Sequence, residues 1–258
     1  MSALATALAA LNHPASRRTY RVAEDADFLA TEEEDQGWRP LGGLLNREAV
    51  VEQADADPVA SLGITELTGT MVFHALAVPL VDLVMGLVLV SNTTVDPIPG
   101  IVLVRFQGPS VIEVALDSSS VLVANPTAEQ IAVALAGALD PLVAAVEPHD
   151  AALRWGALAD LICVVAGARL RAHGLDPDTT WERAEGIVAG LRSHRPHPPE
   201  APGRLGRRST CCEWYRAARH LGEPSVADAR CADCPSLDSA VNASRLTALA
   251  EAGDLANP

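Results

Sequence analysis

Aromatic side chains are scarce in this chain of 258 residues, where they make up 3% of the sequence. A base-stacking surface for nucleic acid or an aromatic cleft for sugars therefore has little material from which it could be built. The formal net charge of −14 also argues against nucleic acid, because most of such a surface would repel phosphates. Lysine is absent and all 19 basic residues are arginine, a bias to which we attach no functional role.

Targeting and nucleotide-binding signatures are missing as well. No positive charge precedes the short apolar run at the N-terminus, so this run does not resemble a secretory signal. The apolar run 71–90 contains Pro79, Asp82 and Gly86, which are costly or disruptive in lipid, and it predicts a buried helix. Neither G-x-G-x-x-G after a strand nor a Walker A sequence occurs. We therefore expect a cytoplasmic protein with no transmembrane segment and no nucleotide site.

Hydrophobic residues form 49% of the chain, enough for a substantial core. Apolar residues and capping signals predict helices over 61–90, from Thr127 onward, over 151–173 with Gly174 as the stop, and over about 178–191 with Asp-Thr-Thr before Trp181 as the cap. His74 and Asp82 lie about two helical turns apart, and we expect a buried polar contact there rather than catalysis.

Three short runs rich in Val and Ile, 101–107, 111–117 and 120–125, predict a small antiparallel meander. The predicted fold is therefore α+β, mainly α-helical, with a small antiparallel β-meander at about 100–125. The proline-rich stretch 193–208 cannot continue a helix. We expect a body over 1–200, a module over 201–240, and a tail or short helix over 241–258.

Four of the five cysteines crowd into positions 211–234. Such crowding and an odd number fit a disulfide scaffold poorly, and clustered thiols in a reducing compartment are more often metal ligands. Cys163 stands apart in the apolar stretch LADLICVVAGARL, where a cysteine is usually a small buried side chain.

Cys211 and Cys212 are adjacent, whereas Cys231 and Cys234 form a C-x-x-C turn that places two sulfurs on one side of a tight loop. Four thiolates at one point repel one another unless a cation compensates, so a metal centre is favoured. Adjacent cysteines make an awkward zinc knuckle because neighbouring side chains diverge, which a binuclear iron–sulfur cluster tolerates better. Structural zinc and disulfides remain as alternatives.

His194 and His197 precede the cysteines and invite a two-His, two-Cys interpretation. Because four cysteines already complete a ligand set, we expect both histidines to be linker residues.

The cysteine segment resembles the cluster-binding segment of the FhuF-like ferric siderophore reductase family. The residues that carry the resemblance are Arg207-Arg208-Ser209-Thr210-Cys211-Cys212, Tyr215-Arg216 and Cys231-x-x-Cys234-Pro235. The likeness covers residues 204–237, and over the body it is one of general layout, including the helix with Leu153-Arg154-Trp155-Gly156. The gap between the two cysteine pairs, residues 213–230, is longer than is usual in that family.

This resemblance implies a [2Fe–2S] cluster bound by Cys211, Cys212, Cys231 and Cys234, used for iron acquisition. The implied reaction is one-electron reduction of Fe(III) in a siderophore, of hydroxamate type, with release of Fe(II). The electron would come from an external ferredoxin or flavoprotein reductase. Candidates for tuning the cluster or lying near the substrate are Arg207, Arg208, Trp214, Tyr215 and Arg216. Two alternatives are an iron–sulfur electron-transfer or iron- or redox-sensing protein without a siderophore pocket, and a structural zinc-binding protein.

Overall fold

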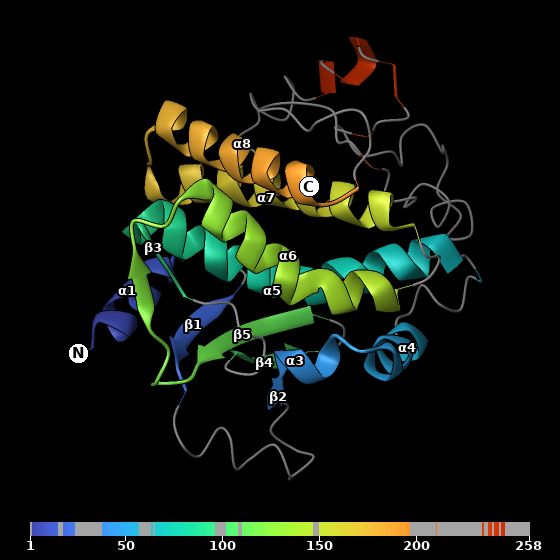
Figure 1. Ribbon diagram of the computed structural model, residues 1–258, viewed down its shortest axis with the longest axis horizontal. Coiled ribbons are helices and arrows are strands. Elements are labelled where there is room, and N and C mark those ends of the chain that lie inside the picture. The colour runs from blue at the N-terminus through green and yellow to red at the C-terminus, as the bar shows by residue number, and fades with distance from the viewer. Residues whose placement is uncertain are drawn as a thin grey trace.

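The computed structural model describes residues 2–14, 18–23, 38–56, 63, 65–95, 102–107, 110–146, 150–196, 210, 234, 237–238, 240–242 and 244–245. Over these residues the protein is mainly helical with two small sheets, which confirms the predicted α+β class. Figure 1 shows the larger sheet on one side of α5, with α7 and α8 on the other side. The helices are α1 (Ala3–Leu11), α3 (Leu41–Leu44), α4 (Arg47–Ala56), α5 (Thr65–Ser91), α6 (Ala128–Ala145), α7 (Ala151–His173) and α8 (Pro177–His194).

Helix α5 forms the centre of the protein. It contacts α1, α4, α6 and α7, and it also contacts the two sheets through β3 (Thr93–Val95) and β5 (Ser110–Leu116). Apolar residues lie on nearly every face, and Phe73, Leu76, Leu80 and Leu87 are among its fully buried side chains. A helix that is hydrophobic all round is buried either in a protein core or in a bilayer, and α5 is buried among the other elements of this chain. The helix continues as one element through Pro79.

The caps of the later helices follow directly from the sequence. Thr127 caps α6, and its hydroxyl accepts the backbone N–H of Gln130 while the Gln130 side chain returns a bond to the Thr127 backbone, a complete capping box. Helix α7 ends at Gly174, which takes the left-handed conformation (φ 60°), as predicted. Helix α8 corrects the prediction, since Asp176 is its cap and the Asp-Thr-Thr run lies inside the first turn.

The larger sheet has strand order β1-β5-β4-β2. Its centre is the expected antiparallel hairpin of β4 (Val102–Gln107) and β5 (Ser110–Leu116). Two strands flank it that the sequence did not predict: β1 (Thr19–Val22) pairs with β5 in parallel, and β2 (Trp38–Pro40) pairs with β4 in antiparallel fashion.

The third expected strand of the meander belongs to another sheet. Strand β6 (Leu122–Ala124) pairs with β3 (Thr93–Val95), which lies in the stretch expected to be only a turn. Asn92 and Asn125 border this ribbon with positive φ angles of 51° and 49° and join through both backbone and side chain. Asparagine tolerates this left-handed conformation well, so it lets the chain turn sharply at both places.

Helices α6 and α8 approach each other closely through small residues. A Cβ atom at Gly190 would lie 2.8 Å from the Cβ of Ala132, and one at Gly186 would lie 3.2 Å from the Cβ of Ala128. The two glycines are one helical turn apart and therefore share a face. Side-chain bulk at Gly190 would separate the two helices.

Within the described residues, three helices are long and apolar enough to cross a membrane by length and composition: α5 from Leu67, α6 and α7. Much of each apolar stretch is buried inside the protein itself. Since length and composition do not decide between a core and a bilayer, the expected absence of a transmembrane segment stays a prediction.

Candidate functional site

One of the four predicted cluster ligands lies among the described residues. Cys234 is buried, with 2% of its surface exposed. The backbone N–H of Leu237 donates to the Cys234 carbonyl at 3.1 Å. Leu237 is also buried. The remaining predicted site residues lie outside the described part of the chain: Cys211, Cys212, Cys231, Arg207, Arg208, Trp214, Tyr215, Arg216 and His197.

The first cysteine pair is preceded by a residue bound to α7. The backbone N–H of Thr210 donates to Oδ2 of Asp160 at 3.0 Å, and the Thr210 hydroxyl donates to the same oxygen at 2.7 Å. Both residues are buried, Thr210 at 8% and Asp160 at 4% exposure. Two hydrogen bonds to one carboxylate oxygen hold both the backbone and the side chain of Thr210 against the middle of α7.

Helix α7 can present this carboxylate because the rest of its length is fixed. Asp150 caps its first turn by accepting the N–H of Leu153, and Gly174 ends it. Between these points Asp160 is an acidic residue within an almost continuous buried apolar run. A buried carboxylate is costly unless donors surround it, so a contact such as that with Thr210 is required for the helix to pack.

Cys163 lies on the same face of α7, about one turn beyond Asp160. It is buried, as the sequence predicts for this cysteine. Burial, followed by the negative charges of Asp160 and Glu185, raises the pKa of its thiol to about 12. The thiol therefore stays protonated at neutral pH, a poor state for a metal ligand.

The start of α7, where the sequence resembles a helix of the reductase family, packs against α5 and the end of α8. Arg154 is buried and donates to the hydroxyl of Thr70 on α5 at 3.0 Å. Burial lowers the pKa of this guanidinium, an effect partly offset by Asp150. Trp155 is also buried, and Cζ of Arg195 lies 5.4 Å from its ring centroid. These contacts join α7 to α5 and to the end of α8.

His194 is a helix residue and not the expected linker residue. It is the last residue of α8, and its Nε2 atom contacts the carboxylate of Glu129 on α6. Within the described residues, no three His, Cys, Asp or Glu side chains come together as metal ligands.

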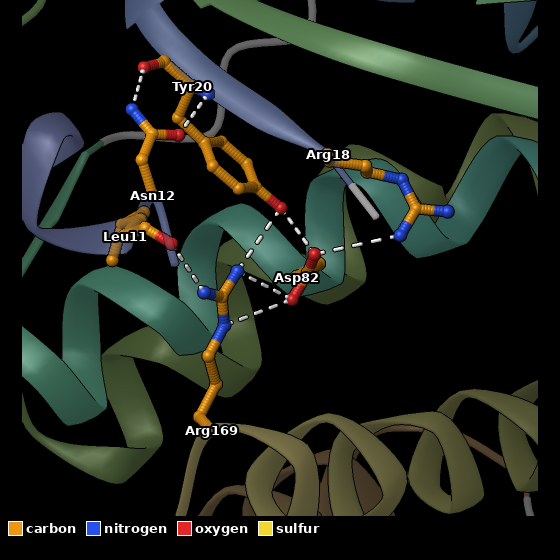
Figure 2. Close-up of polar contacts among 6 residues, drawn as sticks. All are labelled: Leu11, Asn12, Arg18, Tyr20, Asp82 and Arg169. Atoms are coloured by element: carbon orange, nitrogen blue, oxygen red, sulfur yellow. Dashed lines mark hydrogen bonds and ion pairs between the residues drawn. The ribbon is translucent and has the colours of Figure 1, made fainter. Parts of the chain in front are cut away.

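A buried ionic network lies at the other end of α7 (Figure 2). Asp82 on α5 accepts two hydrogen bonds from Arg169 on α7, at 2.9 and 3.2 Å, and one from the Tyr20 hydroxyl on β1. Arg169 also donates to the Leu11 carbonyl at the end of α1, at 2.9 Å. Asp82 thus makes buried polar contacts with Tyr20 and Arg169, whereas the contact expected between His74 and Asp82 stays a prediction.

The electrostatics of this network favour a neutral Tyr20 phenol beside the charged side chains of Asp82 and Arg169. Burial, followed by the charge of Asp82, raises the pKa of Tyr20 well above its usual value, so the phenol keeps its proton and remains a donor. Arg18 adds a second cation, 3.6 Å from Asp82. With every polar atom of the carboxylate engaged by these donors, the network joins α1, β1, α5 and α7 rather than presenting a free acid or base.

No protein-family model, curated protein or solved structure matches this chain. The resemblance of the cysteine segment to the reductase family therefore rests on the residues of the motif alone.

Sequence reasoning missed Asp160 as a residue of this site. The available signal is a lone acidic residue in the run LADLICVV, which must find donors if the helix is buried. Its partner lies 50 positions further along the chain, and no local pattern identifies that partner.

Proposed function

We propose that this chain is a cytoplasmic ferric siderophore reductase, with a [2Fe–2S] cluster held by Cys211, Cys212, Cys231 and Cys234. One observation carries the proposal: both cysteine pairs adjoin buried residues of the folded chain. Thr210, bonded to Asp160, directly precedes the first pair, and Cys234 of the second pair is itself 2% exposed. Four cysteines are the donor set that a [2Fe–2S] cluster requires, so the residues present fit the group.

The roles of the chain's own residues follow from their chemistry. The four thiolates would bind the irons, and the burial of Cys234 would limit the access of water to that ligand. When bound, the cluster supplies one electron at a time. Arg207, Arg208 and Arg216 are cations close in sequence to the ligands, where positive charge raises the reduction potential. The electron itself comes from an external donor such as a ferredoxin or flavoprotein reductase, since the sequence has no nucleotide-binding signature.

The substrate is iron in a chelate with hard oxygen donors, such as a hydroxamate siderophore. Such donors hold Fe(III) much more tightly than Fe(II), so one added electron weakens the complex and releases the metal. In the proposed reaction, the ferric chelate accepts one electron and releases Fe(II) and the free siderophore.

Cluster binding is tested on protein purified without oxygen after growth with ample iron. We expect a red-brown protein, loss of its visible absorption and iron on Cys231→Ser, and retention of both on the matched control Cys163→Ser. The control differs because Cys163 is a buried thiol with a raised pKa. A wild-type protein that is colourless and free of iron would contradict the proposal, and a colourless protein with zinc would favour the structural zinc alternative.

The reductase step needs its own test. Wild-type protein reduced with dithionite and freed of excess reductant should be oxidised by a stoichiometric ferric hydroxamate, with Fe(II) captured by a ferrous chelator. The control is the same protein exposed to air alone. If the chelate oxidises the protein no faster than air does, the electron-transfer or sensing alternative replaces the reductase.

A further inference from the structure

Asp160 and Thr210 form a contact directly before the first pair of cysteines in the sequence. Oδ2 of Asp160 receives both the N–H and the hydroxyl of Thr210, at 3.0 and 2.7 Å. Hydrogen bonds to an ionised acceptor are shorter and about twice as strong as neutral ones. The pair therefore fixes the orientation of the Thr210 backbone as well as its side-chain rotamer.

The next residue in the sequence is Cys211, followed by Cys212. Because a peptide unit is planar and each residue adds only two soft backbone torsions, fixing Thr210 restricts where the following residue can begin. Asp160 is itself held in place, since it lies in the middle of a capped helix of 23 residues. Groups that orient metal ligands contribute strongly to metal affinity, although they do not bind the metal themselves.

We propose that Asp160 is a positioning residue for the cluster, which acts through its two hydrogen bonds to Thr210, the residue that precedes Cys211 and Cys212 in the sequence. This inference rests on the proposed cluster. It adds to that proposal a residue from the helical body, outside the segment that carries the family resemblance.

A purely structural role makes a different prediction, and the chain offers a matched control. Thr180 on α8 is as buried as Thr210, and its hydroxyl donates to the Asp176 carbonyl at 2.7 Å. Thr180→Val and Thr210→Val are the same substitution, each removing one hydroxyl hydrogen bond at a buried site. Only the second borders the cysteines in sequence.

The experiment uses the full chain purified without oxygen and follows three quantities. These are the rate at which visible absorption is lost to excess iron chelator, the electron paramagnetic resonance spectrum after dithionite reduction, and the urea midpoint of unfolding. The variants are Thr210→Val, Thr210→Ser, Asp160→Ala and Thr180→Val. Loss of a group that orients metal ligands typically costs 10–100-fold in metal affinity.

We expect Asp160→Ala to release iron roughly 10-fold faster or more than the wild type, and Thr210→Val to release it faster with an altered resonance spectrum. Thr210→Ser keeps the hydroxyl and should restore both properties. Thr180→Val should lower the urea midpoint and leave the release rate and spectrum unchanged. If Asp160→Ala does not fold, the comparison of Thr210→Val with Thr210→Ser still tests the positioning role.

Two failures are distinguishable. Wild-type rates and spectra in Thr210→Val and Asp160→Ala would overturn the positioning role and leave the proposed function standing. A wild-type protein without iron would overturn the proposed function and this inference together.

Discussion

Arg169 is buried at a position where four hydrogen bonds reach it from three other elements. It donates to Asp82, to the Tyr20 hydroxyl and to the Leu11 carbonyl. The charge of a buried guanidinium is tolerated only with such partners, and the same holds for Asp82, which is 14% exposed in its side chain. Removing one partner leaves the other charge buried, which costs more than the pair itself contributes.

We predict that Arg169→Leu lowers the free energy of unfolding by about 3 kcal/mol, the lower end for a broken buried pair, because Asp82 keeps Tyr20 and Arg18. Adding Asp82→Asn to this variant should recover part of the loss, because it removes the negative charge that Arg169→Leu leaves without its main partner. Urea unfolding followed by circular dichroism measures both effects.

The control is Arg39→Ala, which removes an exposed ion pair with Glu52 and should change stability by less than about 1 kcal/mol. Equal stability of Arg169→Leu and Arg39→Ala would mean that the network in Figure 2 contributes nothing to folding.

His173 is a second residue with a measurable consequence. Its Nε2 atom is buried and has no hydrogen-bond partner within the described part of the chain. Burial, followed by the charges of Arg169 and His13, lowers the pKa of the ring. The rings of His13 and His173 lie 5.5 Å apart between centroids.

A lowered pKa means that the unfolded chain binds a proton more readily than the folded one. The stabilising contribution of neutral His173 is therefore present above the usual histidine pKa of about 6.5 and is lost as the pH falls through the lower folded value. We predict that His173→Gln weakens the acid-induced loss of stability. The measurement compares urea midpoints one pH unit above and one pH unit below the usual histidine pKa of about 6.5. An unchanged pH dependence would contradict this prediction.

At the scale of elements, the contact between α6 and α8 depends on Gly190. A methyl group there would lie 2.8 Å from the Cβ of Ala132, closer than real Cβ contacts allow, and 3.0 Å from Oε2 of Glu129, which is a tight contact. We predict that Gly190→Ala lowers stability by about 1–3 kcal/mol, as overpacking does. Gly137→Ala on α6 is the matched control, because nothing lies within 4 Å of its Cβ position. It should raise stability by roughly 0.5–1 kcal/mol through helix propensity, and equal effects of both substitutions would contradict close packing.

The elements that the sequence predicts well are those with local signals. Helix α7 has its boundaries marked by Asp150 and Gly174, and the hairpin of β4 and β5 has two Val-rich runs with a turn between them. Strands β1 and β2 have 4 and 3 residues and find their partners far away in the chain. Such pairings depend on what the core leaves exposed, so no local periodicity reveals them.

The same distinction applies to the candidate site. The spacing of the cysteines is a local motif and can be recognised in the sequence. The contact between Asp160 and Thr210 joins positions 50 apart, and it becomes visible only when α7 is folded and its polar atoms are matched to donors. The linker prediction for His194 is wrong because the prolines that follow it indicate a linker, whereas α8 extends to this residue.

At the scale of the whole molecule, α5 separates two regions. The larger sheet packs on α5 through β5, whereas α7, which holds Thr210, packs on the helix from another side (Figure 1). The contact between Asp160 and Thr210 therefore belongs to the layer of helices that contains α7 and not to the sheet.

The three long apolar helices give a prediction for the protein as a whole. Their apolar faces pack against one another, and the Asp82–Arg169 pair lies between α5 and α7. We predict that the full chain, expressed without detergent, stays in the supernatant after ultracentrifugation of a lysate. Recovery in a membrane pellet that resists an alkaline carbonate wash would show that these helices insert into the bilayer.

The parallel pairing of β1 with β5 has a consequence for synthesis on the ribosome. Thr19 pairs with Glu113 and Val22 with Leu116, so the first strand of the sheet has no ladder until its neighbour has been translated. At 5–20 residues per second, that wait is roughly 5–20 s, and Arg169, which fastens Leu11 and Tyr20, emerges later still. Strand β1 therefore stays unpaired during that wait, which gives chaperones time to bind it.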